Sequence, residues 1–166
     1  RLHGNSFRGL GGLTKLDLEK SRIIEIQAEA FIGLDNLQTL LLMNNNITRL
    51  QSNSFNGLGN LKNLHLQGNY ITRLQPNFFN ALSSLKVLGL EHNRINAILP
   101  ETFNGLRTLH TLKLQKNNFT RLLWDFFYRL HNLKVLHLQD NFINYIQHGA
   151  FNGLNNLNEL YLQDND

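Results

Sequence analysis

The sequence predicts an α/β solenoid, a curved horseshoe with a parallel β-sheet on its concave face. Three observations predict this fold. The motif L-x-x-L-x-L-x-x-N-x-I returns every 24 residues along the whole chain. A phenylalanine later in the unit keeps one phase throughout. No insertion interrupts the period, so each unit buries its apolar face by stacking on its neighbours.

Each unit is expected to begin with a strand, because x-Leu-x-Leu-x alternates inward leucines with outward variable side chains. An asparagine ends the strand, and its carboxamide can both donate to and accept from backbone groups of adjoining turns. Stacked units therefore predict an asparagine ladder. Its members are Asn45, Asn69, Asn93, Asn117, Asn141 and Asn165, with Ser21 in their place in the first copy.

The rest of each unit carries an apolar pair, then the phenylalanine, then a leucine. A phenylalanine repeated at one phase predicts an aromatic column beneath the convex side. Its members are Phe7, Phe31, Phe55, Phe79, Phe103, Phe127 and Phe151. Glycine follows in most units, but Ala81 and Arg129 take its place in two, which indicates that glycine is not required there. The segment is too short for a long helix, so we expect short helical, 3₁₀ or irregular backbone.

Residues 1–166 are expected to form a single array. Six whole units span residues 13–156, with partial units at both ends and no capping units. Stable arrays need end units with a polar outer face, so we expect the chain to be a fragment of a longer protein. No segment reaches roughly 18 consecutive apolar residues, and no secretory signal is visible.

The unit L-x-x-L-x-L-x-x-N-x-I-x-x-I/L-x-x-x-x-F-x-x-L resembles the typical class of extracellular leucine-rich repeats. This class is found in Toll and Toll-like receptors, neuronal adhesion proteins and lamprey variable lymphocyte receptors. The resemblance covers the whole chain, and Ser21 and Phe119 are its local departures. It implies an extracellular protein, secreted or the ectodomain of a membrane protein, acting in innate immunity or cell adhesion. It also implies recognition of a protein ligand or co-receptor, with a homodimer as one form of assembly.

Ligand-binding residues are expected at the outward positions of the concave strands, which the core does not dictate. Leu41 and Met43 add apolar area to this face, and exposed apolar patches often mark contact surfaces. Tyrosine beside charges of mixed sign suits a protein ligand. The candidates are Leu41, Met43, His65, Gln67, Glu91, His92, Lys113, Lys116, His137, Asp140, Tyr161 and Asp164. The competing interpretation is a solvated sheet face whose variation carries no function.

Two further patterns lie beside the strands. Arg49, Arg73 and Arg121 share one phase and could meet an acidic glycan, although a solvated edge with charges at a repeated phase is the preferred explanation. The sequons that begin at Asn46 and Asn118 share another phase, and each is a candidate N-glycosylation site.

The most aromatic stretch of the chain surrounds a member of the phenylalanine column. Trp124, Phe126 and Tyr128 are additional to that column. They predict either partial burial or a lateral or convex contact, as in a receptor dimer. Under the second alternative, the protein is a structural, matrix or adhesion protein that assembles through its edge or convex surfaces.

Composition excludes several other functions. The net charge of +4 is a mild basic excess and does not indicate a nucleic-acid partner. Cysteine is absent, and so are the G-x-S-x-G, phosphate-loop and H-E-x-x-H motifs. His65 and His137 share a column three strands apart, too far for one zinc ion. We therefore predict a non-catalytic protein without metal or cofactor, in which these histidines could make an interface sensitive to pH.

Overall fold

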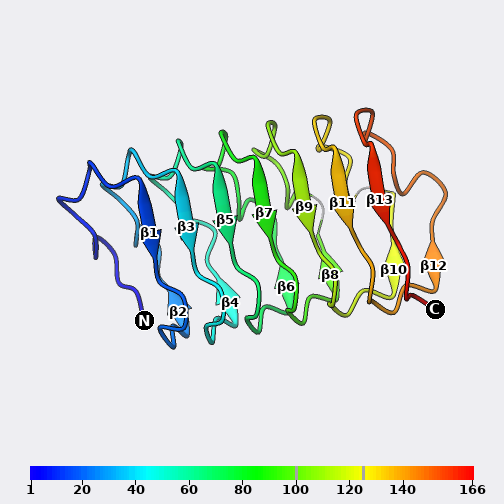
Figure 1. Ribbon diagram of the computed structural model, residues 1–166, viewed down its shortest axis with the longest axis horizontal. Helices are drawn as coiled ribbons and strands as arrows, with labels where there is room; N and C mark the ends of the chain where they lie inside the picture. The colour runs from blue at the N-terminus through cyan, green and yellow to red at the C-terminus, as the bar shows by residue number, and fades with distance from the viewer. Residues whose placement is uncertain (100, 125) are drawn as a thin grey trace.

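The computed structural model describes residues 1–99, 101–124 and 126–166. The chain forms a parallel β-solenoid whose units follow one another along the long axis of the molecule (Figure 1). One parallel sheet takes one short strand from each unit, in sequence order. Its strands are β1 (Lys15–Asp17), β3 (Thr39–Leu41), β5 (Asn63–His65), β7 (Val87–Gly89), β9 (Thr111–Lys113), β11 (Val135–His137) and β13 (Glu159–Tyr161). The predicted solenoid and its sheet are confirmed.

A second set of strands, which the sequence pattern did not predict, follows the asparagine of each unit. These two-residue strands pair as β2 with β4, β6 with β8, and β10 with β12. They are β2 (Glu25–Ile26), β4 (Arg49–Leu50), β6 (Arg73–Leu74), β8 (Ala97–Ile98), β10 (Arg121–Leu122) and β12 (Tyr145–Ile146). Within the described residues the remaining backbone forms turns and irregular segments without helices, so the irregular alternative holds rather than the helical one. Accordingly, no helix there could span a membrane.

The core is a continuous apolar strip inside the coil. Inward leucines such as Leu88, Leu112 and Leu136 are fully buried. Successive phenylalanines stack with ring centroids 5.8 to 6.5 Å apart. Neighbouring strands in a sheet lie only about 4.8 Å apart. The units therefore spread away from the sheet toward the phenylalanine column, which makes the sheet face concave.

The asparagine side chains join each unit to its neighbours. Asn117 Nδ2 donates to the carbonyl oxygens of Leu90 and Leu114, both at 3.0 Å, and Asn117 Oδ1 accepts from Ile95 N at 2.9 Å. The carbonyl of Leu90 also accepts from Asn93. Each such carbonyl is thus shared by two successive asparagines, and the strand ends are fixed in register.

A second ladder lies just before each concave strand and was not foreseen. Asn36, Asn60, Asn132 and Asn156 each donate to a carbonyl one unit earlier at 2.7 to 2.8 Å. Thr108 makes the same contact through its hydroxyl at 3.0 Å. This ladder fixes the edge of the sheet at which the strands begin.

The recurring glycines occupy a backbone conformation that side chains rarely adopt. Gly105 and Gly153, for example, have φ angles of +93° and +90°. Ala81 and Arg129, at the same position of their units, do not have a positive φ. The position therefore accepts a side chain, as in Ala81 and Arg129, where the backbone leaves the positive-φ conformation of the glycine turns.

Burial falls at both ends of the array. Leu136 is fully buried, whereas Leu160, its partner in the last strand, is 39% exposed. Leu10 is 49% exposed at the other end. The end strands therefore lack the covering neighbour that internal units have.

Candidate functional site

The outward side chains at the C-terminal ends of the concave strands form one column. Parallel pairing places them directly opposite one another, since each strand is in register with the next. The column runs Asp17, Leu41, His65, Gly89, Lys113, His137, Tyr161. These side chains do not contribute to the core, so they present the array's variable chemistry on a rigid sheet.

The last three members of the column form a compact group of contacts. The rings of His137 and Tyr161 stack with centroids 4.5 Å apart and an interplanar angle of 2°. The Tyr161 hydroxyl donates to Glu159 Oε2 at 2.6 Å, and Gln139 Nε2 lies 3.4 Å from His137 Nδ1. Lys113 is the register partner of His137 on the other side. The aromatic rings are therefore held in place before any ligand arrives.

Burial and neighbouring charges set the protonation of His137 and Tyr161. Burial lowers the pKa of His137, and Lys113 lowers it further. The hydrogen bond to Glu159 raises the pKa of the Tyr161 phenol. Near neutral pH the histidine is mainly neutral and the tyrosine protonated, so the group offers flat aromatic area between a cation and a carboxylate.

The column of His92, Lys116, Asp140 and Asp164 has a backbone constraint that the sequence did not reveal. Each of these residues has a φ between +53° and +56°. The Lys116 amide donates to a carbonyl of the next unit at 3.2 Å, and corresponding bonds hold His92 and Asp140. All four side chains are exposed. The strained backbone thus presents charged groups beside the aromatic pair.

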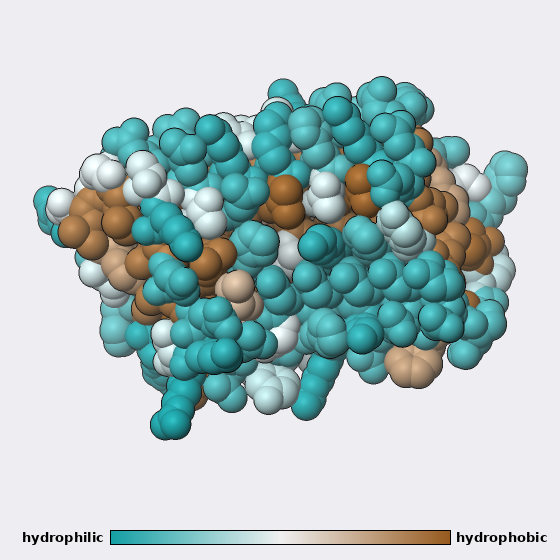
Figure 2. All heavy atoms as spheres, viewed as in Figure 1, coloured by the Kyte–Doolittle hydropathy of each residue, from teal (hydrophilic) through white to brown (hydrophobic). Residues whose placement is uncertain are grey.

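The two apolar candidates for ligand binding, Leu41 and Met43, lie on the N-terminal part of the sheet face. Leu41 and Met43 are each only partly exposed. Figure 2 shows hydrophilic side chains over much of this view, with hydrophobic surface at both ends of the molecule and in smaller patches between them. Leu41 lies between Asp17 and His65, its register partners on the two sides. The apolar candidates are therefore separate side chains within a polar column.

Gly89 makes a gap in the middle of the column. A Cβ placed there would lie 3.0 Å from both Gln67 Oε1 and Glu91 Oε2, and 3.6 Å from His65 Nδ1. These two oxygens are buried without a hydrogen-bond partner in the described part of the chain, as are Oε1 of Gln115 and Gln139. The concave face therefore carries a row of carboxamide and carboxylate groups whose buried oxygens are not exposed to a ligand.

The histidines do not converge. His65 and His137 are separated in the sheet by β7 and β9. Among residues 1–99, 101–124 and 126–166, no three histidine, aspartate or glutamate side chains are grouped closely enough to hold a metal ion. Burial lowers the pKa of His65, with Glu91 and Lys113 acting on it in opposite directions.

The arginine strip is divided by the second set of strands. Arg49 and Arg73 lie in different two-stranded sheets, opposite Glu25 and Ala97. The guanidinium of Arg121 lies 4.8 Å from the ring centre of Tyr145. All three arginines are exposed, but they face different partners and do not form one uniform basic track.

The predicted contact residues around Phe127 divide in the structure. Phe126 is only 9% exposed and packs edge-on against Phe127 at 6.2 Å, which agrees with the alternative of burial for this residue. Trp124 is exposed. Tyr128 is exposed too, but it lies against His131 and the guanidinium of Arg129.

Both sequons are open to solvent. Asn46 and Asn118 are exposed, as are Thr48 and Thr120 that complete the sequons. Their backbone amides donate to carbonyls one unit earlier, so the backbone at each sequon is held by the neighbouring unit. A glycan could be attached at either position without disturbing the core.

Comparison with known proteins gives a consistent result. A family model described as Leucine rich repeat matches residues 11–71, 59–119 and 107–166. The crystal structure of a complex of TLR13, Toll-like receptor 13, with ssRNA13 superimposes with a TM-score of 0.95 at 32% sequence identity. The match covers 99% of this chain and 23% of the TLR13 chain, so the array spans about a quarter of that protein. No curated protein sequence matches the chain.

Proposed function

The chain belongs to the leucine-rich repeat family, and we propose that it is a non-catalytic recognition module. In this proposal it is a segment of an extracellular receptor ectodomain that binds a protein ligand through its concave face. The similarity to a Toll-like receptor supports the receptor assignment. The observation that carries the concave-face assignment is the group of Lys113, His137 and Tyr161, ordered in register on a rigid sheet.

The geometry of this group favours a protein surface. Stacking fixes the rings of His137 and Tyr161 in advance. These two side chains therefore lose little conformational entropy when a ligand covers them. Aromatic anchors of this kind contribute much of the binding free energy at protein interfaces.

An RNA ligand is the alternative that the similar structure raises, because TLR13 was crystallised with ssRNA13. Phosphate groups require clustered cations. On the C-terminal half of the concave face, Lys113 and Lys116 are opposed by Asp140, Glu159 and Asp164. This balance of charge favours a protein ligand of mixed charge there.

The concave-face proposal can be tested by site-specific photocrosslinking. A photoreactive amino acid at position 137 should capture a secreted or cell-surface protein, whereas one at Asn152, on the exposed loop after the phenylalanine column, should not. The captured protein is then titrated against the unchanged chain and against Lys113→Ala/His137→Ala/Tyr161→Ala. Losing one hot spot of about 2 kcal/mol or more predicts at least about 30-fold weaker binding. Equal affinity of a folded triple variant would remove this surface as the ligand site.

The extracellular assignment has its own test. Expression with a secretion signal in animal cells should add glycan at Asn46 and Asn118, because both sequons are exposed. Enzymatic removal of N-glycans should then lower the mass, and Asn46→Gln/Asn118→Gln should abolish that change. Secreted, folded protein without N-glycan at either position would count against it.

Assembly through an edge is a second candidate function, and one observation favours it. An apolar depression of about 320 Å³ includes Leu99, Leu123 and Phe126 in its lining. Leu99 is 39% exposed and Trp124, next to Leu123 in the chain, is 52% exposed. Sedimentation equilibrium tests this candidate: a dimer that Trp124→Ala converts to a monomer would support it, and a monomer at all concentrations would exclude it.

A further inference from the structure

Positive charge gathers on the edge of the solenoid where the concave strands begin. Four successive segments, residues 56–63, 80–87, 104–111 and 128–135, reach this edge and contain no aspartate or glutamate. Their basic residues are Lys62, Lys86, Arg107, His110, Arg129, His131 and Lys134. The overall charge is only +4, so this edge is much more basic than the molecule as a whole. We call these seven residues the basic edge.

The basic residues lie close enough to influence one another. Burial lowers the pKa of His110, and Lys86 and Lys134 on the neighbouring units lower it further. Lys134 and Arg129 are exposed, and Lys86 is partly exposed. The basic edge is therefore a continuous surface over neighbouring units rather than scattered side chains.

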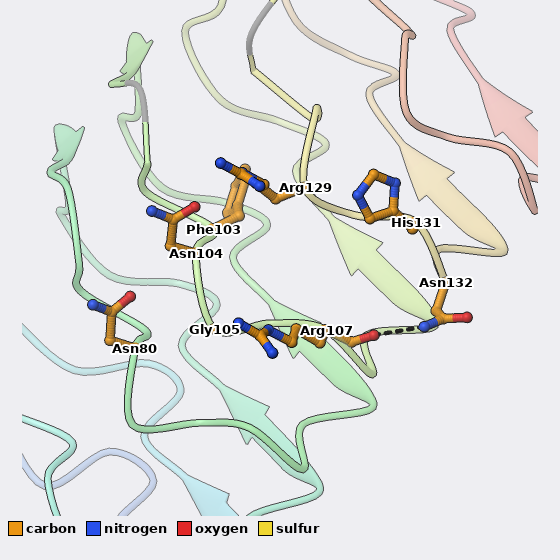
Figure 3. Close-up of a pocket in the computed structure, with 8 residues that line it drawn as sticks. All are labelled: Asn80, Phe103, Asn104, Gly105, Arg107, Arg129, His131 and Asn132. Atoms are coloured by element: carbon orange, nitrogen blue, oxygen red, sulfur yellow. Dashed lines mark hydrogen bonds between the residues drawn. The ribbon is translucent and has the colours of Figure 1, made fainter.

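An open cavity of about 590 Å³ lies on this edge (Figure 3). Its polar lining comes from three successive units and consists of Asn80, Asn104, Asn132, Arg107, Arg129 and His131. A cavity of this size holds a ligand of several rings or sugar units rather than a single ion. The aromatic rings in the lining are Phe103, which is 3% exposed, and the imidazole of His131, so nucleic-acid bases would find only one exposed ring for stacking in the cavity.

Hydrogen bonds to backbone carbonyls and one cation–π contact hold polar side chains of the lining in position. Asn132 Nδ2 donates to the Arg107 carbonyl at 2.7 Å, which joins the two units that carry the arginines. His131 Nδ1 donates to the Gly153 carbonyl at 3.1 Å, which orients the ring and leaves Nε2 available. Arg129 rests on the ring of Tyr128, its guanidinium 5.1 Å from the ring centre. In Figure 3 the guanidinium groups of Arg107 and Arg129 lie apart from each other in the lining.

We propose that the cavity between Arg107 and Arg129 binds a sulfated polysaccharide. Guanidinium groups hold oxyanions by paired charge-assisted hydrogen bonds, which fits sulfate and carboxylate groups. Carboxamides of Asn80 and Asn104 both donate and accept, which fits sugar hydroxyls. Lys86 and Lys134, which both act on His110, add positive charge to the same edge. This site lies apart from the concave strands and from the strip of Arg49, Arg73 and Arg121, and it does not depend on the proposed concave-face function.

The test measures heparin oligosaccharide binding by calorimetry at several salt concentrations. Arg107→Ala/Arg129→Ala should weaken binding at least about tenfold, because both guanidinium groups and their charge-assisted hydrogen bonds to the sulfate groups are lost. The slope of log affinity against log salt should fall in magnitude by about two. The matched control, Arg49→Ala/Arg73→Ala, removes the same charge elsewhere and should leave the affinity within about twofold. Arg107→Gln/Arg129→Gln, which keeps more of the aliphatic stems, serves as the same test should the alanine variant fail to fold.

Several results would overturn the proposal. Equal weakening by the two pairs would show attraction to net charge alone. Binding of desulfated heparin as strong as that of heparin would show that the sulfate groups are not recognised. Tighter binding of a single-stranded RNA with the same number of charges would assign the surface to nucleic acid, and undetectable heparin binding at low salt would exclude the site altogether.

Discussion

Replacing Asn117 by alanine tests the asparagine ladder in the middle of the array. The side chain is 3% exposed and makes bonds of 2.9 to 3.0 Å to Ile95 N and to the carbonyls of Leu90 and Leu114. Alanine leaves the Ile95 amide without its partner, whereas each carbonyl keeps one bond from a neighbouring ladder asparagine. An orphaned buried amide costs about 1 to 3 kcal/mol, and each lost second bond about 0.5 to 1.5 kcal/mol. We expect the free energy of unfolding to fall by about 3 kcal/mol.

The assay is equilibrium unfolding in urea, followed by far-ultraviolet circular dichroism and by the fluorescence of Trp124, the only tryptophan. Coincident transitions establish two-state behaviour, which repeat arrays do not always show. The matched control is Asn118→Ala, which removes the same side chain from an exposed position and should change stability by less than about 0.5 kcal/mol. Asn165→Ala, in the partly exposed last member of the ladder, should fall between the two.

The structure requires the loss of stability to be largest for Asn117→Ala, smaller for Asn165→Ala and smallest for Asn118→Ala. A loss below about 0.5 kcal/mol for Asn117→Ala, with an unchanged denaturant slope, would show that water replaces the carboxamide without penalty. Equal losses at Asn117 and Asn118 would likewise refute the argument, because only the Asn117 side chain is buried and bonded to backbone groups of the neighbouring units.

Three further predictions concern backbone strain and protonation. Gly105→Ala should lower the thermal midpoint and cost at least about 1 kcal/mol, because φ is +93° and a Cβ would lie 2.8 Å from a neighbouring backbone carbon. The control Gly59→Ala has open space around its Cβ and should leave the midpoint unchanged. Lys116→Gly should stabilise the chain by up to about 1 kcal/mol in urea titrations by relieving a φ of +56°, and a loss would show that the lysine side chain matters more than strain. Burial lowers the pKa values of His65 and His137, so the unfolded chain takes up protons first as the pH falls below their ordinary value of 6.5. Stability should therefore decrease on acidification through this range, less steeply in His65→Gln/His137→Gln; a profile that rises in the wild-type chain contradicts the assignment.

Much of the fold could be predicted because a 24-residue period constrains every unit in the same way. The positions of Leu112, Asn117 and Phe127 follow from phase alone, since a unit that broke the phase could not stack. The second set of strands could not be predicted in this way. Segments such as Arg49–Leu50 are only two residues long and alternate too briefly to be recognised.

Only part of the candidate site could be predicted from the repeat phase. Phase placed Lys113, His137 and Tyr161 in one column, and the strand register agrees. Phase could not show that Phe126 turns inward against Phe127, because both side chains are equally apolar in the sequence. It also could not show the left-handed backbone at Lys116, since lysine carries no signal for that conformation.

By itself the sequence determined the solenoid, the number of its units and the identity of the core, because repeated leucine, asparagine and phenylalanine act on nearest neighbours only. The tertiary structure decided which outward side chains meet. Arg107 and Arg129 are 22 residues apart and share no motif, yet coiling brings them onto the lining of one cavity. The stacking of His137 on Tyr161 likewise depends on strand pairing. The repeat fixes the spacing and register of the units, whereas the chemistry of the surface depends on which side chains successive units bring next to one another.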